Sequence, residues 1–120
     1  MSTRDIGNMG EQAVCDMLLR HGYRILKRNY TIRGGEIDII AEKNKLLSFV
    51  EVKTRRHDPL TTGEQAITYA KRRHIIKAAE RFMLTLDEPM NARFDVAVVE
   101  HDKGKITKIR YYVSAFDASK

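Results

Sequence analysis

The chain of 120 residues is 42% hydrophobic and 32% charged, which is typical of one globular domain and excludes a disordered chain. No stretch reaches the ~18 apolar residues of a membrane span, and the N-terminus lacks the apolar run of a secretory signal, so we expect a cytoplasmic protein without membrane contact. The net charge of +6 permits a polyanionic partner, while a single cysteine, Cys15, excludes an intrachain disulfide and a thiolate metal site.

Hydrophobic spacing and turn residues predict helices and strands in the order α-β-β-β-α-β-β. Apolar residues three and four apart indicate a first helix, which Asp5 or Asn8 would cap and Gly22 would end. A second helix is expected at 65–86, and strands are expected at 23–30, 36–41, 46–53, 94–99 and 106–113. The pattern therefore predicts a single α/β domain over residues 1–120.

Two predicted connections border the most informative part of the sequence. A polar turn at 43–45 joins the strands 36–41 and 46–53 as an antiparallel hairpin. Residues 54–62 contain Pro59 and several charges, which predicts a connection whose mobile part covers residues 55–62. Such a loop would lie beside the hairpin and would be able to close over a substrate.

Acidic residues interrupt the two strands of this hairpin, which otherwise look buried. Side chains alternate along a strand, so Asp38 shares a face with Glu36, and Glu51 shares a face with Lys53. A two-residue turn at 44–45 would place Asp38 directly opposite Glu51, whereas a turn one residue earlier would pair Glu51 with Glu36. Either register keeps the acids on one face, and a three-residue connection would need a bulge to do so.

Two carboxylates this close together need a compensating cation, because like charges opposed across a sheet are destabilising and a buried unpaired carboxylate is costly. Lys53 is expected to supply part of the charge. A divalent ion would supply the rest, since Mg²⁺ is held by one or two carboxylates with waters and phosphate oxygens. Such an ion activates water and stabilises a phosphodiester under attack. The pattern predicts a phosphodiester hydrolase that uses Mg²⁺ or Mn²⁺.

A basic segment follows these acids. Residues 53–81 carry eight Lys or Arg and three acids, and therefore hold +5 of the net +6. Clustering of this kind is the pattern expected where phosphates are held, so we expect a nucleic acid as the partner. Adjacent helical residues diverge by ~100°, so only one or two of the residues 71–73 would contact a backbone. The candidate contacts are Arg55, Arg56, Lys71, Arg72 and Arg73.

Four motifs in this order resemble the PD-(D/E)xK nuclease superfamily, which includes restriction endonucleases, archaeal-type Holliday junction resolvases and RecB-like exonucleases. They are GEQA at 10–13, GEID at 35–38, FVEVKT at 49–54 and RFDV at 93–96. More narrowly, the chain resembles the YraN-like family of small, largely uncharacterised bacterial proteins, and the resemblance covers most of its length. It implies a restriction-endonuclease-like fold, in which helices flank a central mixed sheet. The proline that gives the superfamily its name is replaced by Ile37.

The resemblance implies a role for each residue of the central pattern. Asp38 and Glu51 would be metal ligands, and the backbone carbonyl of Val52 would be a further one. Glu11 in the first helix matches an acid that contributes to the metal site in resolvase-like members. Lys53 would position the attacking water.

Further implications concern the substrate and the assembly. Gln65 and Tyr69 match the glutamine and tyrosine of the RecB-like helix and would contact nucleic acid, since their four-residue spacing places them on one helical face. Resolvase-like relatives act as symmetric dimers, so a homodimer is expected here. A chain of this length has little room for a recognition module, which favours structured or processed DNA over a long specific sequence.

Structural interpretations stand beside these roles. The acids and Lys53 would also fit a solvated salt-bridge cluster, Glu11 also suits the positive end of a helix dipole, and Gln65 and Tyr69 would also fit packing on the sheet. Asp95 receives no chemical role. Two alternatives to a nuclease therefore remain: a nucleic-acid-binding accessory protein with a vestigial site, and a structural or partner-binding domain.

Overall fold

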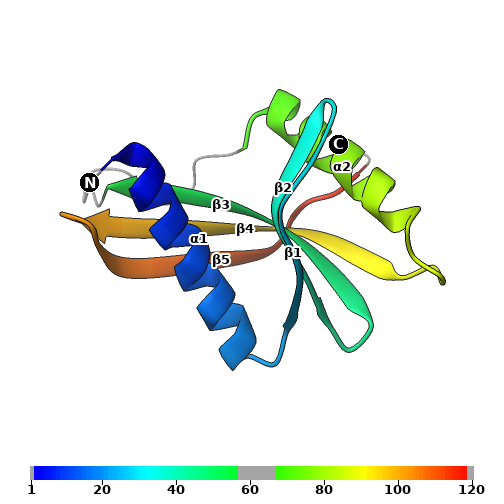
Figure 1. Ribbon diagram of the computed structural model, residues 1–120, viewed down its shortest axis with the longest axis horizontal. Coiled ribbons are helices and arrows are strands. Elements are labelled where there is room, and N and C mark those ends of the chain that lie inside the picture. The colour runs from blue at the N-terminus through cyan, green and yellow to red at the C-terminus, as the bar shows by residue number, and fades with distance from the viewer. Residues whose placement is uncertain (1, 57–66, 119–120) are drawn as a thin grey trace.

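A computed structural model describes residues 2–56 and 67–118, which form a five-stranded sheet and two helices (Figure 1). The elements are α1 (Thr3–Arg20), β1 (Arg24–Ile32), β2 (Gly35–Lys43), β3 (Leu46–Arg56), α2 (Tyr69–Met83), β4 (Asn91–Asp102) and β5 (Lys105–Phe116). The predicted α/β class and the predicted order of elements are confirmed. Within the described ranges, neither helix is long and apolar enough to cross a membrane.

The strands follow one another across the sheet in the order of the sequence, from β1 to β5. Neighbouring strands are antiparallel except β3 and β4, which are parallel. Parallel neighbours need a long crossover connection, and α2 lies within it. Figure 1 shows the β1–β2 hairpin rising away from the other strands, with α1 near one end of the sheet and α2 near the other.

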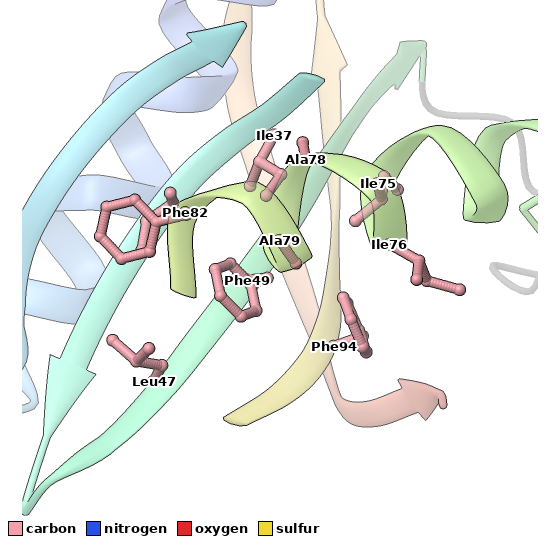
Figure 2. Close-up of a cluster of buried hydrophobic side chains, with 10 residues drawn as sticks. Ile37, Leu47, Phe49, Ile75, Ile76, Ala78, Ala79, Phe82 and Phe94 are labelled. Carbon is pink, nitrogen blue, oxygen red and sulfur yellow. The ribbon is translucent and has the colours of Figure 1, made fainter. Parts of the chain in front are cut away.

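Alternation along β3 sorts the core into two layers on opposite faces of the sheet. Phe49 faces α2, where it packs against Phe82 and Phe94 (Figure 2). Val50 faces α1 and joins a second cluster with Val14, Cys15, Leu18 and Ile39. Cys15 is therefore a buried apolar residue, as its position in the first helix predicts. One face of the sheet therefore packs against α1 and the opposite face packs against α2.

The hairpin between β2 and β3 has the first of the two registers considered from the sequence. Asn44 and Lys45 both have positive φ, at 52° and 64°, as a two-residue type I′ turn requires. Lys43 pairs with Leu46, and the ladder continues to Ile39 and Val50. The register that would pair Glu51 with Glu36 is therefore wrong, as is a three-residue connection.

Some predicted boundaries differ from the structure. Ser2 caps α1 in place of Asp5 or Asn8. Its hydroxyl accepts from the Asp5 amide at 3.1 Å, and its own amide donates to the Asp5 carboxylate. β3 extends to Arg56 because β4 continues beside it, so residues 54–56 belong to the strand and not to a mobile loop. The rest of that predicted loop, 57–62, lies outside the described residues.

The two outer strands pair irregularly with their neighbours. The ladder between β1 and β2 shifts register between Ile25 and Lys27. The ladder between β4 and β5 shifts twice, and one shift lies between Phe94 and Val96. Ser114, opposite that shift, has a φ of 52°. Both edges of the sheet are therefore bulged.

Candidate active site

Asp38 lies where β2 leaves β3. The pairing of these strands ends at Ile39 and Val50, whereas β3 stays paired with β4 along its whole length. Ile37 packs on the α2 side and Ile39 on the α1 side, although residues two apart on a regular strand share a face. β2 is therefore bent at Asp38, and the bend exposes the edge of β3 to this side chain. The amide of Val52 donates to Asp38 Oδ2 at 2.8 Å.

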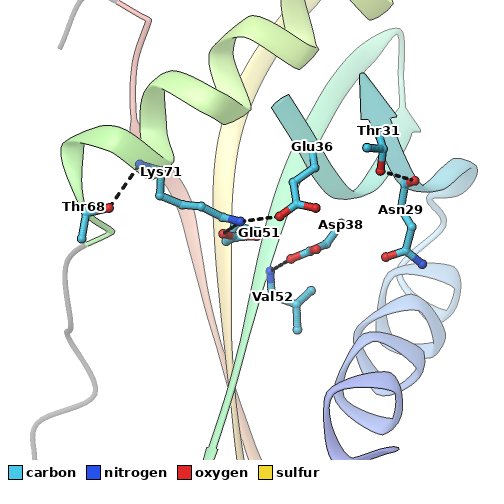
Figure 3. Close-up of polar contacts among 8 residues, drawn as sticks. All are labelled: Asn29, Thr31, Glu36, Asp38, Glu51, Val52, Thr68 and Lys71. Atoms are coloured by element: carbon cyan, nitrogen blue, oxygen red, sulfur yellow. Dashed lines mark hydrogen bonds and ion pairs between the residues drawn. The ribbon is translucent and has the colours of Figure 1, made fainter. Parts of the chain in front are cut away.

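Glu51 is the second acid at this point, and it is only 7% exposed. Burial raises its pKa to about 9, and the neighbouring Asp38 carboxylate adds to the rise, while Lys71 opposes it. Figure 3 shows the carboxyl groups of Glu36 and Glu51 at the Lys71 ammonium, with the Asp38 carboxyl beside them and bonded to the Val52 amide. The predicted meeting of acids from two strands is thus present, and without further positive charge it is electrostatically costly.

Lys71 of α2 supplies the positive charge that reaches these acids. Its Nζ lies 2.9 Å from Glu36 Oε1 and 3.4 Å from Glu51 Oε2. Its backbone amide donates to the Thr68 hydroxyl, which caps the helix. Sequence reasoning expected Lys53 to provide this charge, but in the described part of the chain no ion pair links Lys53 to Asp38 or Glu51. Lys53 alternates onto the same face of β3 as Glu51.

Gly35 allows α2 to bring Lys71 this close. A Cβ on Gly35 would lie 2.6 Å from the carbonyl oxygen of His74 and 3.2 Å from the amide of Ala78. Both are backbone atoms of α2, so no side-chain movement would relieve the clash. The glycine therefore lets the helix backbone rest on the start of β2, next to Glu36.

Gly10 plays the corresponding part for α1. A Cβ there would lie 2.0 Å from Thr54 Oγ1, so the missing side chain lets α1 approach β3. The next residue, Glu11, then lines a cleft of about 330 Å³ together with Asp38 and Val52. Glu11 Oε1 is buried and finds no hydrogen-bond partner among the described residues. Burial raises the pKa of Glu11, and repulsion from Asp38 raises it further.

The fit of these residues to a divalent cation follows from their chemistry. Among the described residues no three His, Cys, Asp or Glu side chains converge as a metal site. Mg²⁺ needs only one or two carboxylates when waters and a substrate phosphate complete its shell. Asp38 and Glu51 supply two crowded carboxylates, and Glu11 adds an unpartnered oxygen nearby. Oxygen donors that repel one another are stabilised by a hard cation, so the set fits Mg²⁺ or Mn²⁺.

Comparison of the sequence with known proteins identifies a family for this chain. The model of "Uncharacterised protein family UPF0102" matches residues 10–99, a span that contains all four motifs. The chain belongs to the UPF0102 family. It is 42% identical to a UPF0102 protein of Symbiobacterium thermophilum over 97% of this chain and 99% of that one. Identity to a UPF0102 protein of Caldicellulosiruptor bescii is 40%, over 97% and 100%. The resemblance to the YraN-like bacterial family is thereby confirmed.

Some of the basic residues predicted to hold phosphates in this UPF0102 chain are paired with acids, and others are exposed. Arg55 lies 3.5 Å from Glu100, and Lys71 is turned to the acids. Arg56 is exposed at the end of β3, where it borders the cleft. Arg73 is exposed on α2. Of the predicted contacts, Arg56 and Arg73 present the most accessible charge.

The predicted pair Gln65 and Tyr69 is only partly described, because Gln65 lies outside the described residues. Tyr69 is 63% exposed, so it does not pack on the sheet. The guanidinium of Arg72 lies over its ring, 5.8 Å from the centroid. Arg72 also borders a larger pocket of about 640 Å³, which holds none of the predicted metal ligands. The smaller cleft, which Glu11, Asp38 and Val52 line, is therefore the candidate site; Glu51 and Lys53 do not line it.

Asp95 of the fourth UPF0102 motif is a structural residue that the sequence left without a role. It is fully buried and accepts from Arg93 Nε, from the Tyr111 hydroxyl at 2.6 Å and from the Ser114 amide at 2.9 Å. Burial and the bond to Asp95 raise the pKa of Tyr111, so the phenol keeps its proton. The network holds the bulge of β5 against β4. An acid within an apolar run was the only sequence signal for it.

Proposed function

We propose that the chain is a nuclease of the PD-(D/E)xK superfamily that uses Mg²⁺ or Mn²⁺ to hydrolyse phosphodiester bonds in DNA. Glu51 is the observation that carries the proposal. It is buried beside a second carboxylate, and its pKa is raised to about 9. Burying such a group weakens the fold unless a cation joins it, and costly arrangements of this kind cluster at functional sites.

The acids and lysines in and beside the cleft each have a part in the proposed reaction. A bound divalent ion would act as a Lewis acid and lower the pKa of water. Asp38 and Glu51 would hold it, with Glu11 from α1 and the Val52 carbonyl as further oxygen donors. Lys71 holds Glu36 and Glu51 in place through its ammonium group. Lys53 would orient the attacking water from the Glu51 face of β3.

The choice of DNA rests on charge and on size. Arg56 is exposed at the border of the cleft and Arg73 is exposed on α2, and cations of this kind bind phosphates regardless of base sequence. The described domain is small beside the surface that a long specific sequence would need, which favours structured or processed DNA. A homodimer would bring two such clefts to two strands.

One observation favours a second candidate, a nucleic-acid-binding accessory protein that does not cut. Within the described ranges, three potential metal-ligating side chains never converge. Such a protein would bind DNA with a strong salt dependence and would leave it intact with every metal.

Substitutions of the two central acids test the proposal. Metal binding is measured by calorimetry, and cleavage is measured on branched and linear DNA with Mg²⁺, Mn²⁺ or EDTA. Asp38→Asn and Glu51→Gln are expected to lose metal binding and at least ~100-fold in cleavage rate, while DNA binding in EDTA stays within about threefold. Glu42→Gln is the matched control, because Glu42 lies on β2 but pairs with Arg24, away from the cleft. Wild-type protein that binds no metal and cuts neither DNA would overturn the proposal.

A further inference from the structure

The cleft beside α1 has two ends of opposite chemistry. Glu11 and Asp38 line one end, and Arg56 and His101 line the other. Arg56 and His101 are paired positions on the parallel strands β3 and β4, so they lie side by side. Figure 1 shows the first turns of α1 at the end of the sheet where these strands finish, and Thr3, Ile6 and Gly7 form that wall.

His101 is incompletely satisfied in this position. Its Nδ1 is buried and has no hydrogen-bond partner among the described residues. Buried polar nitrogens are nearly always hydrogen-bonded, and leaving one unpaired is costly. The ring lines the cleft, so a group that enters the cleft meets an imidazole whose hydrogen-bonding capacity is not filled by the described residues.

Side chains alternate along β3, so Arg56 and its neighbour Arg55 leave the strand in different directions. Val52, Thr54 and Arg56 share the α1 face of β3. Arg55 also borders the cleft, but its guanidinium is paired with Glu100 at 3.5 Å. Across the described ranges no carboxylate forms an ion pair with Arg56. Arg56 therefore brings an available guanidinium to the same end of the cleft as His101.

We infer that Arg56 and His101 form a phosphate subsite at the end of the cleft away from the carboxylates. A guanidinium fork and an imidazole N–H both donate to the oxygens of a phosphate. The inference rests on the proposed function for the nature of the ligand, a nucleic-acid strand. Phosphate binding itself requires no cleavage.

The length of the cleft supports a strand over a single nucleotide. From residue 52 to residue 56, β3 advances roughly 13 Å at ~3.3 Å per residue. A single phosphate group would not span the distance from Asp38 to Arg56. The ligand therefore carries at least two linked phosphates, one held by Arg56 and His101 and another beside the acids. The phosphate at the basic end is either an internal diester or a terminal monoester.

The test measures DNA binding by fluorescence anisotropy in EDTA, so that no metal and no cleavage are involved. The full chain is compared with Arg56→Gln and His101→Gln, and with the matched controls Arg20→Gln and His21→Gln at the far end of α1. Each subsite variant is expected to bind about five- to tenfold more weakly, and Arg56→Gln to lower the salt slope by about 1. The controls are expected to bind as wild type does.

Three single-stranded DNAs of one sequence identify the phosphate: a circle, a linear strand with a 5′-phosphate and a linear strand with a 5′-hydroxyl. Equal effects of the substitutions on all three indicate an internal diester. An effect confined to the 5′-phosphorylated strand indicates a terminal monoester. The ring ¹⁵N signals of His101 in wild-type protein, followed during DNA addition, give a readout that does not depend on a variant folding.

The inference is overturned if both subsite variants bind every DNA as the controls do and the His101 signals do not move. That result is distinct from failure of the proposed function. If wild type never cuts DNA, but Arg56→Gln and His101→Gln still weaken binding, the subsite stands and the nuclease does not.

Discussion

Two buried acids on neighbouring strands have opposite surroundings. Asp95 pairs with Val50 in the ladder between β3 and β4, and Glu51 is the next residue along β3. Asp95 faces α1 and is surrounded by donors from Arg93, Tyr111 and Ser114. Glu51 faces α2 beside another carboxylate, and among the described residues Lys71 is the cation that approaches it.

This contrast separates an acid that stabilises the fold from an acid that weakens it. A buried carboxylate with several donors is fully satisfied, and removing it leaves those donors buried without partners. A buried carboxylate facing a second one gains from losing its charge. Glu51 therefore needs an explanation outside the fold, and a bound cation provides one.

The largest expected effect is on Asp95. Asp95→Ala should lower the free energy of unfolding by roughly 3–5 kcal/mol, because the donors of Arg93 and Tyr111 stay buried without an acceptor. Chemical denaturation measures it, or loss of folded protein where the domain cannot tolerate the change. Glu42→Ala, which removes an exposed ion pair with Arg24, should cost no more than about 1 kcal/mol. Equal effects of the two substitutions would remove the distinction between the acids.

Glu51→Gln should have the opposite sign and stabilise the metal-free protein. The folded pKa of Glu51 is raised from 4.5 to about 9, so wild type is least penalised below pH 4.5 and loses stability as the pH rises toward 9. At pH 7 the gain in the variant should reach at most about 3 kcal/mol. Melting temperatures of both proteins between pH 5 and 9 should diverge as the pH increases; parallel curves would contradict the assignment.

Glycine substitutions in α1 test how Glu11 reaches this cluster. Gly10→Ala should cost about 2 kcal/mol, because its Cβ would clash with Thr54. Gly7→Ala is the matched control in the same helix, since a Cβ there meets nothing within 4 Å. It should gain up to about 1 kcal/mol from helix propensity. Denaturation curves that rank the two variants in the reverse order would show that α1 does not rest on β3 at Gly10.

The smallest effect separates the two lysines near Glu51. Lys71→Met should lower the free energy of unfolding by about 1 kcal/mol at pH 7, since it removes the partly screened ion pair with Glu36. The loss should shrink in a Glu36→Gln background, which a double-mutant cycle measures. Lys53→Met should leave stability unchanged. If Lys53→Met lowered the free energy of unfolding and Lys71→Met did not, Lys53 and not Lys71 would be the cation that stabilises these acids.

The order of the elements and the polar turn before β3 could be predicted, because the contacts that determine them are local. The sequence left two hairpin registers open, and the positive φ of Asn44 and Lys45 selects the one that brings Asp38 toward Glu51. The position of Lys71 was not predictable, because it depends on the docking of α2 on Gly35 from a distant part of the chain. The same holds for the end of β3, which extends because β4 pairs beside it.

The donors around Asp95 come from still more distant parts of the chain. Tyr23 donates no bond to this acid but accepts from Arg93, and Tyr111 reaches it from β5. Neither tyrosine stands in a pattern that marks a polar partner. A buried network of this kind is assembled by the sheet, so only the structure reveals which acid it satisfies.

The bulged edges of the sheet limit how copies of the chain can associate. An outer strand with a regular row of unpaired amides is a template for another strand, and this is a common route to aggregation. The register shifts in β1 and β5 interrupt that row at both edges. Bulges of this kind twist an edge strand away from a neighbour, so the edges of this sheet are poor templates for joining two copies into one continuous sheet.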